Sequence, residues 1–229
     1  MKRNWFYLGD RKTDYLSLLS ECCAVKLEGK SIDIGRAVLA EQVHGDHIHI
    51  CTESDSGAGF EGREKIAGAD GLITAIPNQY LMIRTADCYP VLIFDPECKA
   101  IAALHSGREG TRLNITGKAI NILKDEFGCD PAKLCAYIGA GVCEDHYEVS
   151  EDIYESFIND ISAQGFAHRA PHRSLNLRMV VFQQLIKCGI TFKNIENIQE
   201  CSYENQAYFS YRRDKGNNRQ INIIGIIDE

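Results

Sequence analysis

The sequence predicts an α+β protein in which two mixed sheets pack together and helices cover their outer faces. Apolar runs of strand length outnumber amphipathic runs of helical length. Several strands follow one another with only a turn between them, which argues against a doubly wound parallel sheet. No internal repeat or low-complexity linker divides the chain. Residues 1–229 are therefore expected to form a single domain.

The first quarter of the chain reads as one helix and two strands. A helix is predicted over 14–23, with Asp14 as its cap, and an approach strand over 32–43. Residues 47–51 alternate like a half-buried strand, whose two histidines are expected on its solvated face. A polar, glycine-rich loop follows over 52–68. Its G-x-G-x-x-G lacks an adjoining strand and an apolar helix, so it is not interpreted as a dinucleotide site.

The remaining elements are set by apolar periodicity and by turn residues. Asn114 or Thr116 caps an amphipathic helix that stops at Gly128, and two more helices are expected later in the chain. The predicted strands are 71–74, 81–85, 91–95, 100–104, 134–142, 194–199, 207–213 and 221–228, and the predicted helices are 117–127, 152–158 and 175–188.

Composition argues against several broad functional classes. The chain is 45% hydrophobic and 25% charged, as in ordinary globular proteins. A net charge of −7 without a basic stripe argues against nucleic-acid binding. No apolar run approaches the ~18 residues of a membrane span, and no signal-peptide pattern is present, so a cytoplasmic protein is expected. The ten cysteines include no C-x-x-C pair and are expected to be mostly free thiols.

Three residues at strand ends form the candidate site. Cys88 and His105 each follow an apolar strand at a small turn, and His44 stands in a similar place upstream. Two imidazoles and one thiolate suit zinc, and three protein ligands leave a fourth position open for water or substrate. The alternative from spacing alone is a small core cysteine and two histidines satisfied by backbone, because no short ligand pair anchors the set.

Several stretches form a recognisable series along the chain. They are QVHG at 42–45, ADGLIT at 69–74, TADCYPVLIFD at 85–95, AALHSGREGT at 102–111, YIGAGVCEDHYEV at 137–149, LNL at 175–177 and FSYRRDKGNNRQ at 209–220. In this order they resemble the YfiH family, also called laccase-domain or multicopper polyphenol oxidase-like proteins.

The resemblance implies a fold, a metal and an activity. The fold is similar to cysteine hydrolase-like α/β/β/α sandwiches. The family's zinc ligands fall on His44, Cys88 and His105. Family members are described as purine nucleoside phosphorylases that use phosphate to cleave adenosine, inosine and methylthioadenosine. Adenosine deamination, copper-dependent phenol oxidation and peptidoglycan-precursor editing are also attributed to the family. The implied partners are a purine nucleoside and phosphate, and no oligomeric state follows from the sequence.

Catalytic and phosphate-binding roles are assigned to residues around these ligands. Cys88, His105 and Asp87 are the catalytic candidates; Asp87 orients a ligand or handles a proton. Asp87 and Cys88 reach one site only if the strand breaks there, which Tyr89-Pro90 allows. Guanidinium groups suit oxyanions. The candidates for phosphate are Arg84, Arg108, Arg212, Arg213 and Arg219.

The chain departs from the family pattern beside a predicted ligand. The usual H-A-G-W-R-G reads HSGREG, so Arg108 replaces a tryptophan and Glu109 an arginine. The usual I-G-P-C-I-G reads IGAGVC, which brings in Ala140 and Gly141. If Glu109 approaches the metal, it repels phosphate and favours deamination. The alternative is that it turns outward and pairs with Arg108 or Arg112.

Other functions remain open at this stage. A multicopper oxidase needs more imidazoles than the seven histidines supply, although copper is an alternative occupant of the zinc site. Metal-free hydrolysis with Cys88 as nucleophile uses the same residues. A non-catalytic binding module is disfavoured, because structural zinc normally has four protein ligands.

Overall fold

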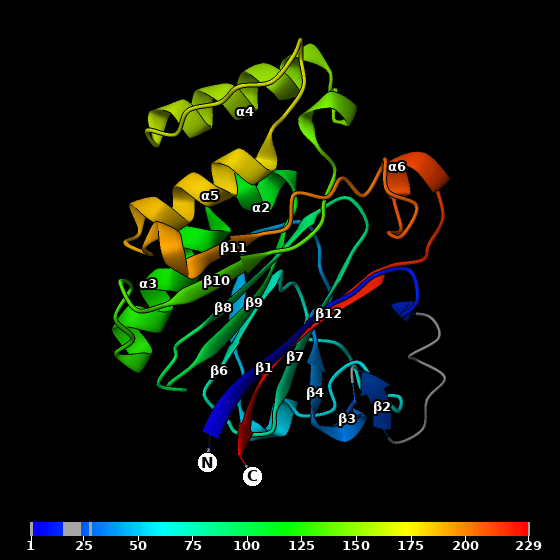
Figure 1. Ribbon diagram of the computed structural model, residues 1–229, viewed down its shortest axis with the longest axis vertical. Coiled ribbons are helices and arrows are strands. Elements are labelled where there is room, and N and C mark those ends of the chain that lie inside the picture. Colours follow the sequence, from blue (N-terminus) through cyan, green and yellow to red (C-terminus); the bar gives the residue numbers. More distant parts are fainter. Residues whose placement is uncertain (1, 16–23, 28, 229) are drawn as a thin grey trace.

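The computed structural model describes residues 2–15, 24–27 and 29–228, which form two mixed sheets, a hairpin and a set of helices (Figure 1). The strands are β1 (Lys2–Leu8), β2 (Ala24–Leu27), β3 (Lys30–Asp33), β4 (Ala37–Leu39), β5 (Ile48–Ile50), β6 (Gly71–Thr74), β7 (Tyr80–Thr85), β8 (Tyr89–Phe94), β9 (Ile101–Ser106), β10 (Cys135–Ile138), β11 (Ile195–Asn197) and β12 (Gln220–Asp228). The α-helices are α2 (Arg108–Arg112), α3 (Ile115–Phe127), α4 (Glu151–Ala163), α5 (Leu177–Lys187) and α6 (Tyr211–Asp214).

The two sheets have four and six strands. The smaller sheet has the order β1-β12-β7-β4, and the larger has the order β11-β10-β8-β9-β6-β5. Neighbours are mostly antiparallel, whereas β4–β7, β5–β6 and β10–β11 are parallel pairs. The mixed α+β fold predicted from sequence is thereby confirmed.

Alternating apolar side chains build the layers of the core. In β8, Leu92 packs between the two sheets, whereas Val91 and Ile93 join the layer beneath the helices. In β7, Leu81 lies between the sheets and Met82 faces the outer side of the four-stranded sheet. Side chains of successive strand residues point to opposite faces, so a nearly continuous apolar strand serves two layers at once.

The helices α3, α4 and α5 contribute to the apolar layer on the six-stranded sheet, as Figure 1 shows from the side. The opposite face of the four-stranded sheet packs, within the described residues, against the β2–β3 hairpin and Phe60. The predicted helix over 14–23 falls mostly on residues 16–23, outside the described part of the chain. The cysteine hydrolase-like α/β/β/α arrangement stays a prediction.

Three local predictions differ from the structure. A strand is predicted over 207–213, but Ser210 accepts a hydrogen bond from the amide of Arg213 and caps the short helix α6 instead. The expected strand 32–43 is divided by a 3-10 helix over Ile34–Arg36. Helix α2 replaces the turn expected after His105. Strand β1 had no prediction, because its alternation is hidden by three polar residues at its start.

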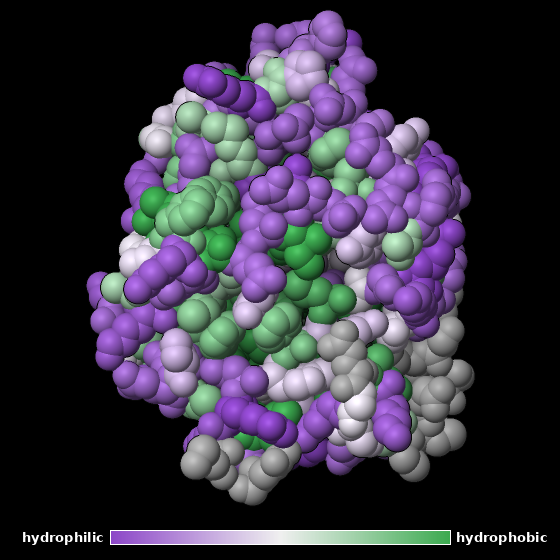
Figure 2. All heavy atoms as spheres, in the orientation of Figure 1, coloured by the Kyte–Doolittle hydropathy of each residue, from purple (hydrophilic) through white to green (hydrophobic). Residues whose placement is uncertain are grey.

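The surface seen in Figure 2 is mostly polar, with apolar side chains gathered near the middle of the view. No helix in the described ranges is both long enough and apolar enough to cross a bilayer.

Candidate active site

The structure brings His44, Cys88 and His105 together. One ligand atom from each lies within 4.8 Å of the other two, and the two imidazole rings meet edge to face at 4.9 Å between centroids. His105 is buried on β9, Cys88 is half-buried and His44 is exposed. The three side chains therefore form a cluster of potential metal ligands that is accessible to solvent on the side of His44.

Two of these residues lie in connections that pass from one sheet to the other. His44 follows β4 of the four-stranded sheet and precedes β5 of the six-stranded sheet. Cys88 lies between β7 and β8, which belong to the same two sheets in the same order. His44 has a φ of 66° and Asp87 a φ of 88°, both in the left-handed region that side chains with a Cβ seldom adopt. These turns end the strands and aim both ligands at β9.

A buried carboxylate, Asp70, holds the centre together. It has no exposed surface and accepts hydrogen bonds from the amides of Val43, His44 and Gly45 at 2.6 to 3.1 Å. It also receives the Nδ1 proton of His105 at 2.7 Å. That bond fixes the tautomer of His105 and leaves its Nε2 as the free ligand atom.

In the metal-free protein, the electrostatics favour an ion pair between a Cys88 thiolate and a protonated His105. Burial alone would raise the pKa of Asp70, but the His105 imidazole and the amides of Gly45 and His44 lower it. Burial also opposes ionisation of Cys88, yet the neighbouring His105 and His44 lower the pKa of the thiol to about 6. In return, against the effect of burial, the Cys88 thiolate and Asp70 raise the pKa of His105 to about 9. A metal ion would displace the Nε2 proton of His105, and one thiolate with two imidazoles then suits zinc as a donor set.

The lowered pKa of Cys88 leads to a testable prediction for the metal-free protein. Since the thiolate is the reactive species and forms above the pKa, alkylation of Cys88 by iodoacetamide should be half-maximal near pH 6. Burial raises the pKa of Cys135, which is the internal control and should react only in more alkaline solution. The measurement is peptide mass spectrometry after timed labelling at each pH. Equal pH profiles for the two thiols would contradict the ion pair.

The three donors border a cavity of about 1100 Å³. Its volume is at the upper end of the range for small-molecule sites. Tyr147 lies on its wall beneath the guanidinium of Arg212, at 5.0 Å, and burial raises the pKa of this phenol to about 12. The cationic side chains on the wall are Arg84, Arg108, Arg212, Lys215 and Arg219.

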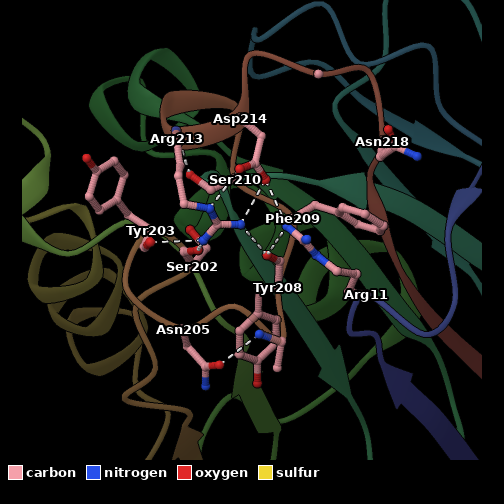
Figure 3. A network of polar contacts seen from close by, with 12 residues as sticks. Arg11, Ser202, Tyr203, Asn205, Tyr208, Phe209, Ser210, Arg213, Asp214 and Asn218 are labelled. Carbon is pink, nitrogen blue, oxygen red and sulfur yellow. Dashed lines mark hydrogen bonds and ion pairs between the residues drawn. The ribbon is translucent and has the colours of Figure 1, made fainter.

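Four of the five predicted phosphate-binding arginines line this cavity, and Arg213 does not. Arg213 donates from Nη1 to the carbonyls of Ser202 and Tyr203, and from Nη2 to that of Tyr208. Its Nε and Nη2 also bind the two carboxylate oxygens of Asp214 (Figure 3). All five N–H groups are used, so the structure gives Arg213 a place in the loop scaffold and not on the cavity wall.

Arg212, the preceding residue, faces the cavity. Its Nη2 donates to the carbonyl of Glu148, and no other bond of its guanidinium is present within the described residues. Its amide donates to Asp87 Oδ2, and the hydroxyl of Ser202 donates to Asp87 Oδ1. Asp87 directly precedes Cys88, so these two bonds connect the turn between β7 and β8 to the first turn of α6 and to Ser202.

At the departure from the family pattern, Glu109 pairs with both neighbouring arginines, as the alternative predicts, although it also lies on the cavity wall. Glu109 lies between Arg108 and Arg112, with oxygen–nitrogen distances of 3.0 and 2.8 Å. Burial alone would raise the pKa of this carboxyl, but these two guanidinium groups lower it. Its charge is therefore compensated locally, which removes the physical reason to expect repulsion of phosphate.

Several residues of the site had no prediction from spacing. Asp70, Tyr147 and Lys215 each lie in a stretch that carries the family resemblance, within 69–74, 137–149 and 209–220. Asp70 could have been found as the only acidic side chain directly before an apolar strand in its stretch. Nothing in the local pattern marks Tyr147 or Lys215.

Comparisons with known proteins identify the family of the chain. Residues 7–227 match the family described as multi-copper polyphenol oxidoreductase laccase. The structure of the Bacillus licheniformis hypothetical protein YfiH superposes with a TM-score of 0.76 at 30% identity, over 86% of this chain and 76% of that one. The chain belongs to the YfiH, or laccase-like, family. A further structure of similar fold is that of YlmD from Geobacillus stearothermophilus, with a TM-score of 0.78 at 26% identity, over 86% of this chain and 76% of that one.

Two curated relatives of this YfiH-family chain carry names of enzymes. The purine nucleoside phosphorylase Cj1217c of Campylobacter jejuni is 30% identical over 197 residues, which cover 86% of this chain and 80% of the relative. The adenosine deaminase RL5 of an unknown prokaryotic organism is 26% identical over 218 residues, 90% of this chain and 79% of the relative.

Proposed function

We propose that this protein is a zinc-dependent purine nucleoside phosphorylase that acts on adenosine, inosine and methylthioadenosine. The single observation that carries the proposal is a three-donor centre at the edge of a cavity with five cationic side chains on its wall. The names of the relatives support the same reaction class. A divalent cation and guanidinium groups are what binding of a phosphate dianion requires.

The cavity wall offers separate surfaces for the two substrates. Arg108 has both Nη groups without a hydrogen-bond partner in the described ranges, and Arg212 has one such group, so each can donate to phosphate oxygens. Flat surfaces for a purine come from guanidinium–phenol pairs, such as Arg84 over Tyr15 at 4.7 Å and Arg219 over Tyr211 at 5.6 Å.

In phosphorolysis a phosphate oxygen forms a bond to C1′ of the ribose, the C1′–N9 bond breaks, and the departing purine gains a proton. Zinc, when bound, supplies a Lewis acid that polarises a substrate oxygen. His44, Cys88 and His105 would hold it, and Asp70 keeps His105 in its ligating tautomer. The arginines fix the phosphate in line with C1′ and offset its charge. Asp87 holds Arg212 through its backbone amide, so we assign Asp87 a positioning role.

Deamination of adenosine is the second candidate, supported by the name of one relative. The H-x-E and P-C-x-x-C signatures of the base-editing zinc deaminases are absent from the sequence. A multicopper oxidase has less support, because within the described residues His44 and His105 are the only histidines that share a ring contact. Copper remains an alternative occupant of the centre.

An assay of the zinc-loaded protein with and without phosphate tests the proposal. Phosphorolysis releases adenine and ribose 1-phosphate from adenosine only when phosphate is present. Deamination releases inosine at the same rate in both conditions. The proposed activity would be refuted if the rate of product formation were the same with and without phosphate, or if none of the three nucleosides gave a product.

The two neighbouring arginines give a matched pair of variants. Arg212→Ala should raise the KM for phosphate about tenfold or more, because one charged donor of the cavity is lost. Arg213→Ala should mainly lower the melting temperature, because the carbonyls of Ser202, Tyr203 and Tyr208 lose their donor. Steady-state kinetics and thermal unfolding on both variants check this. A phosphate KM unchanged in Arg212→Ala would contradict it.

A further inference from the structure

A second group of donors lies outside the active centre, around Cys143, His146 and Cys201. One ligand atom from each lies within 4.8 Å of the other two. Both thiols are buried, and His146 is half-buried on a short 3-10 helix over Glu144–His146. Glu204 approaches the same imidazole with its carboxylate. We propose that these four residues bind a structural zinc ion, distinct from the metal of the active centre.

The spacing of the donors is that of a metal site. Cys143 and His146 form a C-x-x-H pair, and Cys201 and Glu204 form a C-x-x-E pair, each within a single turn of chain. Short pairs of this kind are typical of structural zinc sites, where two local pairs from separate segments meet. The active centre has no such pair, which is consistent with an open, catalytic site there.

The two distances to His146 Nδ1 agree with tetrahedral coordination. Zinc bound at about 2.3 Å from sulfur and about 2.0 Å from nitrogen or oxygen separates S from N by about 3.5 Å and N from O by about 3.3 Å. In the structure Cys143 Sγ lies 3.2 Å from His146 Nδ1, and Glu204 Oε1 lies 3.5 Å from the same nitrogen. The amide of Cys143 also donates to Cys201 Sγ at 3.3 Å, which brings the two donor segments together.

The site would join two segments that shape the active centre. The first continues from His146 to Tyr147, which lines the cavity, and Tyr203 stacks on His146 at 4.4 Å. The second carries Ser202, which donates to Asp87, the residue before Cys88. Arg213 also holds this loop, by donating to the carbonyls of Ser202 and Tyr203 (Figure 3). We infer that the ion fixes the loop over 201–204 and, through it, Asp87.

A third group, His49, Cys51 and Asp55, does not carry the same inference. The Oδ2 atom of Asp55, 3.0 Å from His49, already accepts from the amide and the hydroxyl of Thr52. That carboxylate is a helix cap, and the group has three donors where a structural zinc needs four.

Metal analysis of the full chain tests the second site without reference to activity. Protein saturated with zinc and freed of excess should carry two ions per chain, and Cys88→Ala should carry one. X-ray absorption of the Cys88→Ala protein should then show two sulfur ligands at about 2.3 Å. Adding Cys201→Ser to Cys88→Ala should remove the remaining ion. Cys98→Ser is the matched control, since Cys98 is as buried as Cys143, at 8% exposure, and should leave two ions bound.

Several results would overturn the second site. They are a Cys88→Ala protein without zinc, zinc retained after Cys201→Ser, and thiol counting that finds Cys143 and Cys201 joined in a disulfide. If Cys201→Ser does not fold, His146→Ala serves instead, since its side chain is partly exposed. In the Cys88→Ala background it should weaken zinc retention against a chelator at least tenfold, and unchanged retention counts against the site.

Discussion

Cys88→Ala is expected to lose the metal of the active centre together with phosphorolysis. The thiolate is the only anionic ligand of the three, and its removal leaves two neutral imidazoles to compete with water. If the metal contributes ~4 kcal/mol to transition-state stabilisation, kcat/KM should fall about a thousandfold. The zinc content should fall by one ion per chain, measured beside the nucleoside assay.

The same variant separates metal chemistry from catalysis by a bare thiol. Wild-type protein stripped by a chelator should lose activity and regain it with zinc, because its thiolate survives the treatment. Cys88→Ala should not recover under any zinc concentration that leaves Cys98→Ala fully active. Full activity in stripped wild-type protein would support Cys88 as a nucleophile and contradict the metal-dependent reaction.

Asp70→Asn should have the second largest effect, although Asp70 touches no substrate. The amide cannot accept a proton from Nδ1 of His105 and three backbone amides as a carboxylate does. Losing such an outer partner of a ligand typically weakens metal binding about 10–100-fold. Competition with a chelator measures this, and Asp125→Asn, on the exposed face of α3, is the control.

Asp70 should also contribute to stability in a pH-dependent manner. Its pKa is lowered on folding, so its contribution is fully present above the unfolded value of about 3.9 and is lost as the pH falls through the lowered value. At pH 7, leaving buried amides unpaired should cost about 3 kcal/mol or more. Urea unfolding of Asp70→Asn at pH 7 checks this, and a cost below about 1 kcal/mol would mean that the carboxylate is not the organiser of the turn.

The three central donors could be predicted because each carries a local signal. His44, Cys88 and His105 all stand where an apolar strand meets a turn, and that pattern is visible within a few residues. The layered core follows from the same runs, since strands that are apolar throughout must be covered on both faces. The ligand types alone suggested zinc, and resemblance to the family added the expected nucleoside and phosphate substrates.

What the sequence did not predict depends on distant partners. Asp70 and His105 are 35 residues apart, and nothing near either one specifies the bond between them. Arg212 and Arg213 are adjacent and of the same type, yet Arg212 faces the cavity and Arg213 does not. The guanidinium of Arg213 donates to carbonyls that come within reach only when the loop has folded. The pattern of 207–213 favoured a strand because the cap formed by Ser210 has no apolar signature.

The two connections that carry His44 and Cys88 have a consequence for unfolding. Each passes from the four-stranded sheet to the six-stranded sheet, and both ligands meet His105 on β9. An ion bound to these three residues would link both connections to β9, so the two sheets could not separate without releasing it. If the ion binds the native state alone, each tenfold rise in free zinc above the dissociation constant should add ~1.4 kcal/mol to the free energy of unfolding. The melting temperature of the protein should therefore rise with the concentration of free zinc.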